Sequence, residues 1–228
     1  MLERLELLIG KENIEKIQKQ NILVIGLGGV GGYATESLIR SGILNITIVD
    51  FDKVDKTNLN RQILSLNSTL GEYKVNVCYD RIKDINKDCN VKVIREFINE
   101  DNIDLLFKED YTYIIDCCDF IPCKKLIINN CISKKIPFIT CCGTGKRMAP
   151  EKLMITDLRK TCNDPIARIL RKYVKDSNIK GKINVLCSKE LPIKTEGSTI
   201  ASNAFVPASA GLLITSYVIR DVIGYSVK

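Results

Sequence analysis

Short apolar runs alternate with stretches of helical periodicity through the first 145 residues of the chain. Runs of strand length occupy residues 21–25, 46–49, 91–95, 111–115 and 137–140. Helical patterns fall between them, over residues 34–40, 72–86, 101–108 and 121–134. Strands separated by helices are typical of parallel sheets, whose two faces are covered by the connecting helices. The pattern therefore predicts a doubly wound α/β fold with a mostly parallel sheet.

The two ends of the chain depart from this alternation. Residues 1–19 place apolar side chains at near-helical spacing, interrupted at Gly10, which predicts a lead-in of one or two short helices. Residues 175–204 are rich in Lys, Ser, Thr and Gly, which predicts a mobile crossover loop. Around this loop we expect strands at 152–156 and 183–187 and helices at 164–174 and 205–224.

The composition is that of one globular domain covering residues 1–228. Hydrophobic residues make up 45% of the chain and charged residues 27%, and the length suffices for one well-buried core. No run approaches the roughly 18 uncharged apolar residues that a membrane span needs. The N-terminal residues alternate charge and leucine, unlike a signal peptide. We therefore expect a cytoplasmic protein with no membrane partner.

Cysteine and histidine content excludes several kinds of site. The ten cysteines are spread along the chain without a pair of CxxC motifs, so a four-cysteine zinc site is not expected. Several lie inside predicted strands or helices, where a reduced thiol serves as a small apolar filler. The chain has no histidine, which excludes His-based catalytic triads and general bases.

The formal net charge of +7 bears on partners. An excess of Lys and Arg favours a polyanion such as tRNA through counterion release. An ordinary lysine-rich surface would give the same count, so the charge supports a nucleic-acid partner without identifying one.

A glycine turn directly after the first strand is the first chemical signal. The sequence Gly26-Leu-Gly28-Gly29-Val-Gly31 follows an apolar strand and precedes a helix. Such a turn brings backbone N–H groups and a helix N-terminus close to phosphate. Asp50 ends the next strand, where an acid typically bonds ribose hydroxyls. These features predict a Rossmann-like nucleotide site.

Two further features favour a triphosphate over a dinucleotide. The extra glycine gives GxGGxG, and Asp50 is followed by Asp52 in a DxD motif. Just beyond lies Asn58-Leu-Asn-Arg61-Gln62, an NxNRQ motif that has no role in hydride transfer. Amides and a guanidinium gathered there are suited to holding phosphates, because Arg presents a planar fork of donors.

These motifs resemble the superfamily of the ubiquitin-activating enzymes and the adenylyltransferases of sulfur-carrier proteins. The resemblance implies a ubiquitin-activating-enzyme-like fold and adenylation of a carboxylate with ATP and Mg²⁺. It implies that Gly26, Gly28, Gly29 and Gly31 face the nucleotide, with Asp50 at the ribose and Asp52 also binding ATP. It implies that Asn58 and Arg61 bind phosphates, that Gln62 binds ATP, and that Lys74 neutralises the phosphate charge. The second acid of Asp116-Cys-Cys-Asp119 is then the magnesium-side aspartate. Arg61, Lys74 and Asp119 would be catalytic.

Segments outside the nucleotide site narrow the resemblance within this superfamily. Residues 4–10, 157–161, 164–165 and 205–211 resemble the tRNA threonylcarbamoyladenosine dehydratases. Those enzymes activate the carboxylate of the modification with ATP and close a ring next to the tRNA anticodon. The resemblance implies a tRNA substrate and a homodimer, in which Arg4 reaches the nucleotide of the partner subunit. A sulfur-transfer system is a further partner that it allows.

Two other interpretations stay open at this stage. The chain is alternatively an adenylyltransferase for the C-terminal Gly-Gly of a sulfur-carrier protein, although it lacks the paired CxxC motifs common there. It is alternatively a non-catalytic nucleotide-binding module. The chain also departs from its relatives at Asp119-Phe120, where an Asp-Asn pair is usual.

Overall fold

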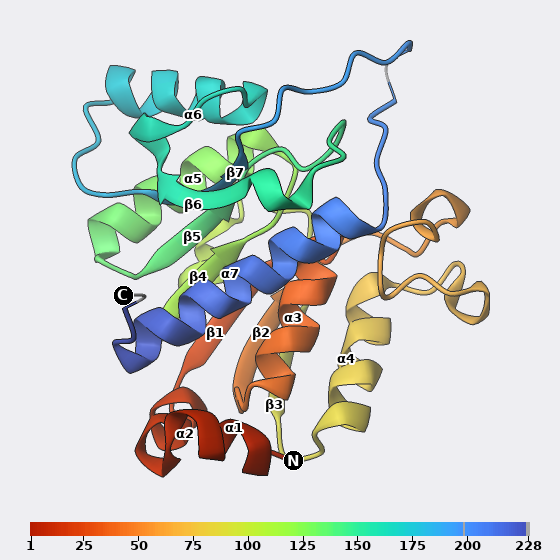
Figure 1. The fold of residues 1–228 in the computed structure, drawn as a ribbon, viewed down its shortest axis with the longest axis vertical. Coiled ribbons are helices and arrows are strands. Elements are labelled where there is room, and N and C mark those ends of the chain that lie inside the picture. The colour runs from red at the N-terminus through yellow and green to blue at the C-terminus, as the bar shows by residue number, and fades with distance from the viewer. Residues whose placement is uncertain (198, 227–228) are drawn as a thin grey trace.

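A seven-stranded sheet forms the middle of the computed structural model, which describes residues 1–197 and 199–226 (Figure 1). Its strand order is β3-β2-β1-β4-β5-β7-β6, and β6 alone runs antiparallel to its neighbour. The strands are β1 (Asn21–Ile25), β2 (Asn45–Val49), β3 (Asn90–Ile94), β4 (Tyr113–Asp116), β5 (Phe138–Cys141), β6 (Leu153–Asp157) and β7 (Asn184–Ser188). The predicted doubly wound α/β fold with a mostly parallel sheet is confirmed.

Helices cover both faces of this sheet, because its central strands are apolar on both sides. In β1, Ile22 and Val24 belong to one core cluster, and Leu23 and Ile25 belong to the other. The first cluster packs under α3 (Gly31–Arg40), α4 (Lys74–Ile85) and α7 (Phe205–Ile223), and the second under α5 (Ile121–Lys134) and α6 (Pro165–Asp176). The lead-in forms α1 (Glu3–Ile9) and α2 (Lys11–Gln18), which are separated at Gly10 as predicted.

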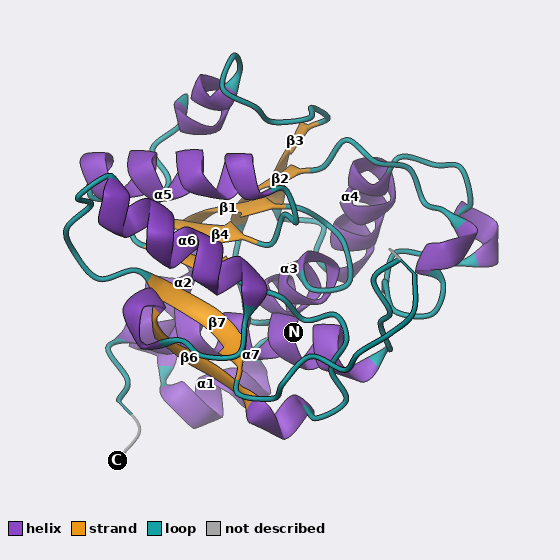
Figure 2. Ribbon diagram, turned by 90° about the horizontal axis from the view of Figure 1, so that it is seen from above, coloured by secondary structure: helices purple, strands orange, loops and turns teal. Residues whose placement is uncertain are grey.

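The direction of the connections reverses between β1 and β4. The chain leaves β1 through α3 on one face and leaves β4 through α5 on the other, while β1 and β4 lie side by side in the sheet. A crevice forms at the carboxyl ends of strands where such a reversal occurs, and ligands bind there. Figure 2 looks onto the sheet along its strands, with α5 and α6 on the side opposite α3.

Two segments differ from the sequence-based expectation. The helix predicted at 101–108 is a 3₁₀ helix of five residues, Ile103–Phe107. Asn102 precedes it in a turn, where its side chain accepts a 2.8 Å hydrogen bond from the N–H of Asn99. The range predicted as a crossover loop, 175–204, contains the end of α6 and all of β7, which leaves residues 177–183, 189–197 and 199–204 outside helices and strands. The mobility of this range stays a prediction, and residue 198 lies outside the described residues.

Helix α7 has the length and apolar character of a membrane span, with a mean hydropathy of 1.3. In the structure the helix lies beside α3 (Figure 1), and one side of it packs into the core cluster that this helix shares with α3 and the sheet. Ala210, Ile214 and Val218 are fully buried in the core cluster that contains β1. The hydroxyl of Thr215 donates a 3.1 Å hydrogen bond to the carbonyl of Ala34 on α3. The helix therefore belongs to the packing of the sheet.

Gly211 allows α7 to cross close over α3. A Cβ placed there would lie 2.5 Å from the Val30 carbonyl oxygen and 2.9 Å from the Ala34 nitrogen. We expect Gly211→Ala to lower the free energy of unfolding by about 1–3 kcal/mol, because this overlap outweighs the roughly 1 kcal/mol of helix propensity that Ala adds. Urea unfolding measures the change. Ser216→Ala, at an exposed position of the same helix, should stay within about 0.5 kcal/mol of wild type.

Candidate functional site

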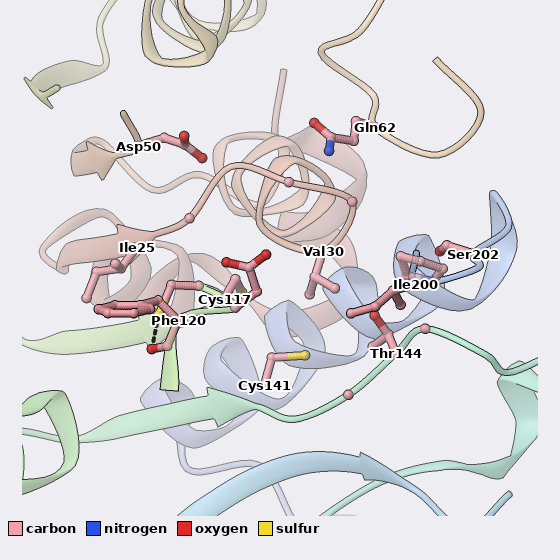
Figure 3. Close-up of a pocket in the computed structure, with 18 of the residues that line it drawn as sticks. Ile25, Val30, Asp50, Gln62, Cys117, Phe120, Cys141, Thr144, Ile200 and Ser202 are labelled. Atoms are coloured by element: carbon pink, nitrogen blue, oxygen red, sulfur yellow. Dashed lines mark hydrogen bonds between the residues drawn. The ribbon is translucent and has the colours of Figure 1, made fainter. Parts of the chain in front are cut away.

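A cavity of about 610 Å³ opens at the carboxyl ends of the central strands. Its lining includes Gly26, Gly28 and Gly29 after β1, the residues after β2 and β4, and the loop after β5. Figure 3 shows Thr144, Ile200 and Ser202 gathered at one end of the cavity, away from Asp50. The sequence-predicted residues that line it are Gly26, Gly28, Gly29, Asp50, Asp52, Asn58, Arg61, Gln62, Lys74 and Asp119.

The glycines of the turn have two different roles. Gly26 has φ +86°, and a Cβ there would lie 2.8 Å from the backbone nitrogen of Cys118 at the end of β4. A Cβ at Gly31 would overlap the carbonyl oxygen of Gly26. Gly31 does not line the cavity, so its contribution is to close the turn. Gly28 has open space beside it, with Gln62 Nε2 the nearest atom at 3.8 Å, and forms part of the cavity wall.

Asp50 ties the glycine turn to the end of β2. Its carboxylate accepts hydrogen bonds from the N–H of Leu27 at 2.6 Å and the N–H of Asp52 at 2.8 Å. Burial raises the pKa of the Asp50 carboxyl above its ordinary value, although the charge of Lys74 and the two N–H donors act in the opposite direction. The acid is therefore held in one orientation, at the position where the fold family places ribose.

Lys74 is buried beside the carboxylates of Asp50 and Asp52. It begins α4 with only 4% of its surface exposed, and its ammonium lies 2.8 Å from Asp52 Oδ2. An uncompensated buried cation is costly, so this pair fixes the ammonium beside the two carboxylates. The sequence identified Lys74 through a motif, but its burial and its bond to Asp52 are visible only in the structure.

The NxNRQ segment forms a short 3₁₀ turn beside the cavity. The side-chain oxygen of Asn58 accepts from the N–H of Asp55 at 3.1 Å, so this residue also caps the turn. The guanidinium of Arg61 donates to the carbonyl of Thr57 at 2.7 Å and to the side chain of Asn60 at 2.9 Å. Arg61 forms no ion pair among the described residues, so its positive charge is available to a ligand in the cavity that it lines.

The side-chain oxygen of Gln62 has no hydrogen-bond partner among the described residues. The Gln62 side chain is 8% exposed and lines the cavity, and its Oε1 is buried without a hydrogen-bond partner. Burying an amide oxygen without such a bond costs about 1–3 kcal/mol.

The end of β4 is anchored by a fully buried ion pair. Lys124 Nζ lies 3.0 Å from Asp116 Oδ2, and the other carboxylate oxygen accepts from the N–H of Cys118 at 3.1 Å. Burial alone would lower the pKa of Lys124, but the Asp116 carboxylate and neighbouring thiols raise it above its ordinary value. This pair holds the turn that presents Asp119, which is exposed at the cavity.

Five cysteines line the same cavity: Cys117, Cys118, Cys123, Cys141 and Cys142. Burial raises the pKa of the Cys117 thiol to about 12. A hydrogen bond with Cys123, together with burial, raises the pKa of Cys118, and burial likewise raises the pKa values of Cys141 and Cys142. The four thiols with raised pKa values, Cys117, Cys118, Cys141 and Cys142, are protonated at neutral pH and are poor nucleophiles there.

Two parts of the cavity wall were not predicted from the sequence. One is an aromatic group in which Phe97 contacts Phe51 and Phe120, each at a ring-centroid distance of 4.9 Å. The other joins the loop after β5 to the crossover segment, through a 2.8 Å hydrogen bond from the N–H of Lys146 to the carbonyl of Ala201. Gly143 and Gly145 mark that loop in the sequence, but nothing in the pattern assigns it a partner.

Arg4 lies apart from the other predicted site residues. It is exposed on α1, at the opposite end of the sheet from the cavity, and does not line the cavity of its own chain (Figure 1). Its predicted role was toward the nucleotide of a partner subunit, and this stays a prediction.

The fold and the cavity together define a doubly wound α/β protein with a glycine turn at its switch point, the arrangement of the nucleotide-binding folds. The model of the ThiF family matches residues 2–149, so the chain belongs to the ThiF family.

Comparison with known proteins narrows the likeness within this family. The chain is 38% identical to the tRNA threonylcarbamoyladenosine dehydratase of Bacillus subtilis, over 96% of this chain and 93% of the relative. It matches the crystal structure of the E. coli tRNA N6-threonylcarbamoyladenosine dehydratase in complex with ATP with a TM-score of 0.90 and 34% identity, covering 96% of this chain and 92% of the other. A more distant relative is the molybdopterin-synthase adenylyltransferase of Salmonella typhimurium, 30% identical over 70% of this chain and 61% of the relative.

Two glycine variants separate ligand binding from folding. Gly28→Ala should leave the free energy of unfolding near that of wild type, because the added methyl group meets only open cavity. It should weaken ATP binding by about 10-fold or more, since backbone N–H groups could no longer approach phosphate closely. Calorimetric titration with ATP and urea unfolding measure the two effects.

Gly31→Ala is the contrasting variant, because its methyl group overlaps Gly26 and must destabilise the fold. Wild-type ATP affinity in Gly28→Ala would contradict the assignment of this wall to the nucleotide.

Proposed function

We propose that this chain is an ATP-dependent tRNA threonylcarbamoyladenosine dehydratase, which adenylates and cyclises the threonylcarbamoyl group beside the anticodon. The observation that carries the proposal is the near full-length likeness to enzymes of that name, with 96% of this chain covered. The matched length includes the region beyond residue 149, where the ThiF family model ends. That region contains the crossover segment that borders the cavity.

In this proposal the cavity binds ATP through the residues that line it. The glycine turn offers N–H groups to the phosphates, and Asp50 accepts from the ribose hydroxyls. The phenyl rings of Phe51, Phe97 and Phe120 provide an apolar wall suited to the adenine base. Asn58 and Arg61 face the phosphates, and Gln62 forms part of the cavity wall beside them.

The donor set fits a magnesium ion that arrives with the nucleotide. Within residues 1–197 and 199–226, no group of three or more His, Cys, Asp or Glu side chains could hold a metal ion. Mg²⁺ usually binds through one or two carboxylates together with water and substrate phosphates, which Asp119 at the cavity can satisfy. Bound there, Mg²⁺ would neutralise phosphate charge during departure of pyrophosphate.

The proposed reaction needs no nucleophile from the protein. The carboxylate of the modification attacks the α-phosphorus of ATP, and the bond to pyrophosphate breaks. An internal nitrogen or oxygen of the same modification then attacks the activated carbonyl and displaces AMP, so one water is lost overall. The residues of the chain orient the reactants and stabilise charge, through Arg61 and Lys74 above all. The raised pKa values of the cavity thiols agree with this assignment.

The alternative of a sulfur-carrier adenylyltransferase rests on the same adenylation step. It is favoured by the Salmonella relative, but the chain spans less of that protein and matches it less closely. Arg61, Lys74 and Asp119, the residues assigned to catalysis, all line the cavity, and this disfavours a non-catalytic nucleotide-binding module.

We extend the proposal to the assembly and location of the enzyme. A homodimer in the cytoplasm would allow Arg4 of one subunit to reach the nucleotide of the other. Leu7 and Leu8 on the same helix are 89% and 79% exposed, which is unusual for apolar side chains and supports a covered α1 surface. A sulfur-transfer system is a further partner in this proposal.

The reaction itself is tested with the purified chain, ATP, Mg²⁺ and tRNA that carries threonylcarbamoyladenosine. We expect the modified nucleoside to lose the mass of one water and AMP to accumulate in equal amount. Mass analysis of digested tRNA measures the first and chromatography the second. Omission of ATP is the control. If the nucleoside keeps its mass while a Gly-Gly carrier protein stimulates pyrophosphate exchange, the adenylyltransferase alternative is correct.

Removal of the Arg61 guanidinium tests the phosphate role. We expect Arg61→Ala to lower turnover by about 10²-fold or more, as loss of one charge-stabilising donor typically does. Arg61→Lys should recover part of the rate, because it keeps the charge but loses the planar fork. Arg40→Ala, which removes an exposed arginine on α3, should leave the rate unchanged. Near-normal turnover in Arg61→Ala would refute the role.

A further inference from the structure

A strongly basic surface lies on α6 and the turn that follows it. A shallow hollow there is lined by the six cations Arg159, Arg168, Arg171, Lys172, Lys175 and Lys180. Only one acidic side chain, Asp176, lines the hollow with them among the described residues. None of these residues belongs to the cavity that holds the proposed ATP site.

Two of the six cations form hydrogen bonds within the protein, and the other four are available to a ligand. Arg159 donates to the carbonyls of Gly181 and Ile179 at 2.8 and 3.0 Å and pairs with Asp157, and Arg171 bonds to Thr161. The other four, Arg168, Lys172, Lys175 and Lys180, are exposed. They form no ion pair with any residue that the structure describes.

Apart from Asp176, which lines the hollow, the acids nearest in sequence do not neutralise this surface. Asp164 turns inward, is 4% exposed, and accepts hydrogen bonds from the N–H groups of Gly143 and Ala167 at 3.0 and 2.9 Å. Asp157 is occupied by Arg159 and by the N–H of Ile183. The surface therefore has a positive charge that the fold does not use.

Helix α6 leads from the nucleotide cavity onto this surface. Pro165 and Ile166, its first residues, line the cavity. Ala167, Leu170 and Val174 face the core. Arg168, Lys172 and Lys175 follow one another at helical spacing on the solvent side. The rise of an α-helix places Lys175 about 15 Å from the cavity edge at Pro165.

We infer that α6 and the turn after it form the docking surface for the phosphate backbone of the RNA whose modified nucleoside enters the cavity. This inference rests on the proposed tRNA substrate. A nucleoside in the cavity has its neighbouring phosphates within reach of a row of cations that starts at the cavity edge. Phosphate contacts of this kind position a nucleic acid without reading its sequence.

The composition of the surface favours RNA over an acidic protein. Protein interfaces are centred on buried aromatic or apolar anchors. The described lining of this hollow includes no aromatic side chain. The ring of the adjacent Tyr173 is not part of it, and the ammonium of Lys125 lies 5.3 Å from the centroid of that ring. Separate lysines and arginines on an exposed face are instead the footprint of counterion release from a polyanion.

The test replaces Arg168, Lys172 and Lys175 together by Gln, which keeps helix propensity while removing three charges. We expect tRNA affinity at low salt to fall by about 10-fold or more, and the slope of log affinity against log salt to shrink by about two to three. KM for tRNA should rise while kcat and ATP affinity stay near wild type. Filter binding over a salt series and steady-state kinetics measure these values.

The matched control is the triple variant of Lys11, Lys87 and Lys108 to Gln, exposed lysines at the amino end of the sheet. It changes the net charge equally and should keep the wild-type salt slope. If the α6 variant binds tRNA as wild type does, with the same salt slope, the inference is wrong. If wild type itself neither binds nor dehydrates tRNA, the proposed function fails before the comparison of variants begins.

Discussion

The close approach of the glycine turn to the end of β4 is the constraint on which the cavity depends. At Gly26 the backbone of the turn lies so near Cys117 and Cys118 that a side chain does not fit. This contact brings the ends of two adjacent strands together at the point where the helical connections reverse. Asp50 then locks the turn from the β2 side through the N–H of Leu27. Three strand ends are thereby held at one place, and they position the polar groups of the candidate site.

The buried ion pair beneath this contact makes the arrangement costly to disturb. Asp116 and Lys124 are both fully buried, so separation would leave an uncompensated charge at an expense of about 3–5 kcal/mol. Because Asp116 also accepts from the N–H of Cys118, the pair fixes the turn in which Asp119 lies. A rigid support of this kind suits adenylation, in which charge must be stabilised at fixed positions as pyrophosphate departs.

Local pattern predicted most of the fold and the polar side of the site. The strand at 21–25 and the helix at 121–134 have the predicted bounds, because their apolar patterns and flanking glycine or proline are local signals. Asp50, Arg61 and Lys74 were found through motifs, and they do line one cavity. The structure adds what depends on distant segments: the bond from Lys146 to Ala201, the Asp116–Lys124 pair, and the grouping of Phe51, Phe97 and Phe120. The length of the helix predicted at 101–108 was overestimated, and the segment is a 3₁₀ helix over Ile103–Phe107. Apolar periodicity does not show where a turn such as that at Asn102 ends a helix.

The charges of the molecule are divided between two tasks with different physical requirements. At the cavity, Lys74 is buried and paired, so its position is fixed and its field acts at short range in a poorly solvated site. On α6, Arg168, Lys172 and Lys175 remain exposed, so their attraction is screened by salt but reaches a large ligand before contact. An enzyme that activates a small group on a long polyanion needs both arrangements. Fixed charge is needed where bonds form and break, and solvated charge is needed where the phosphate backbone of the polyanion binds. The path of α6 from the cavity edge outward connects the two.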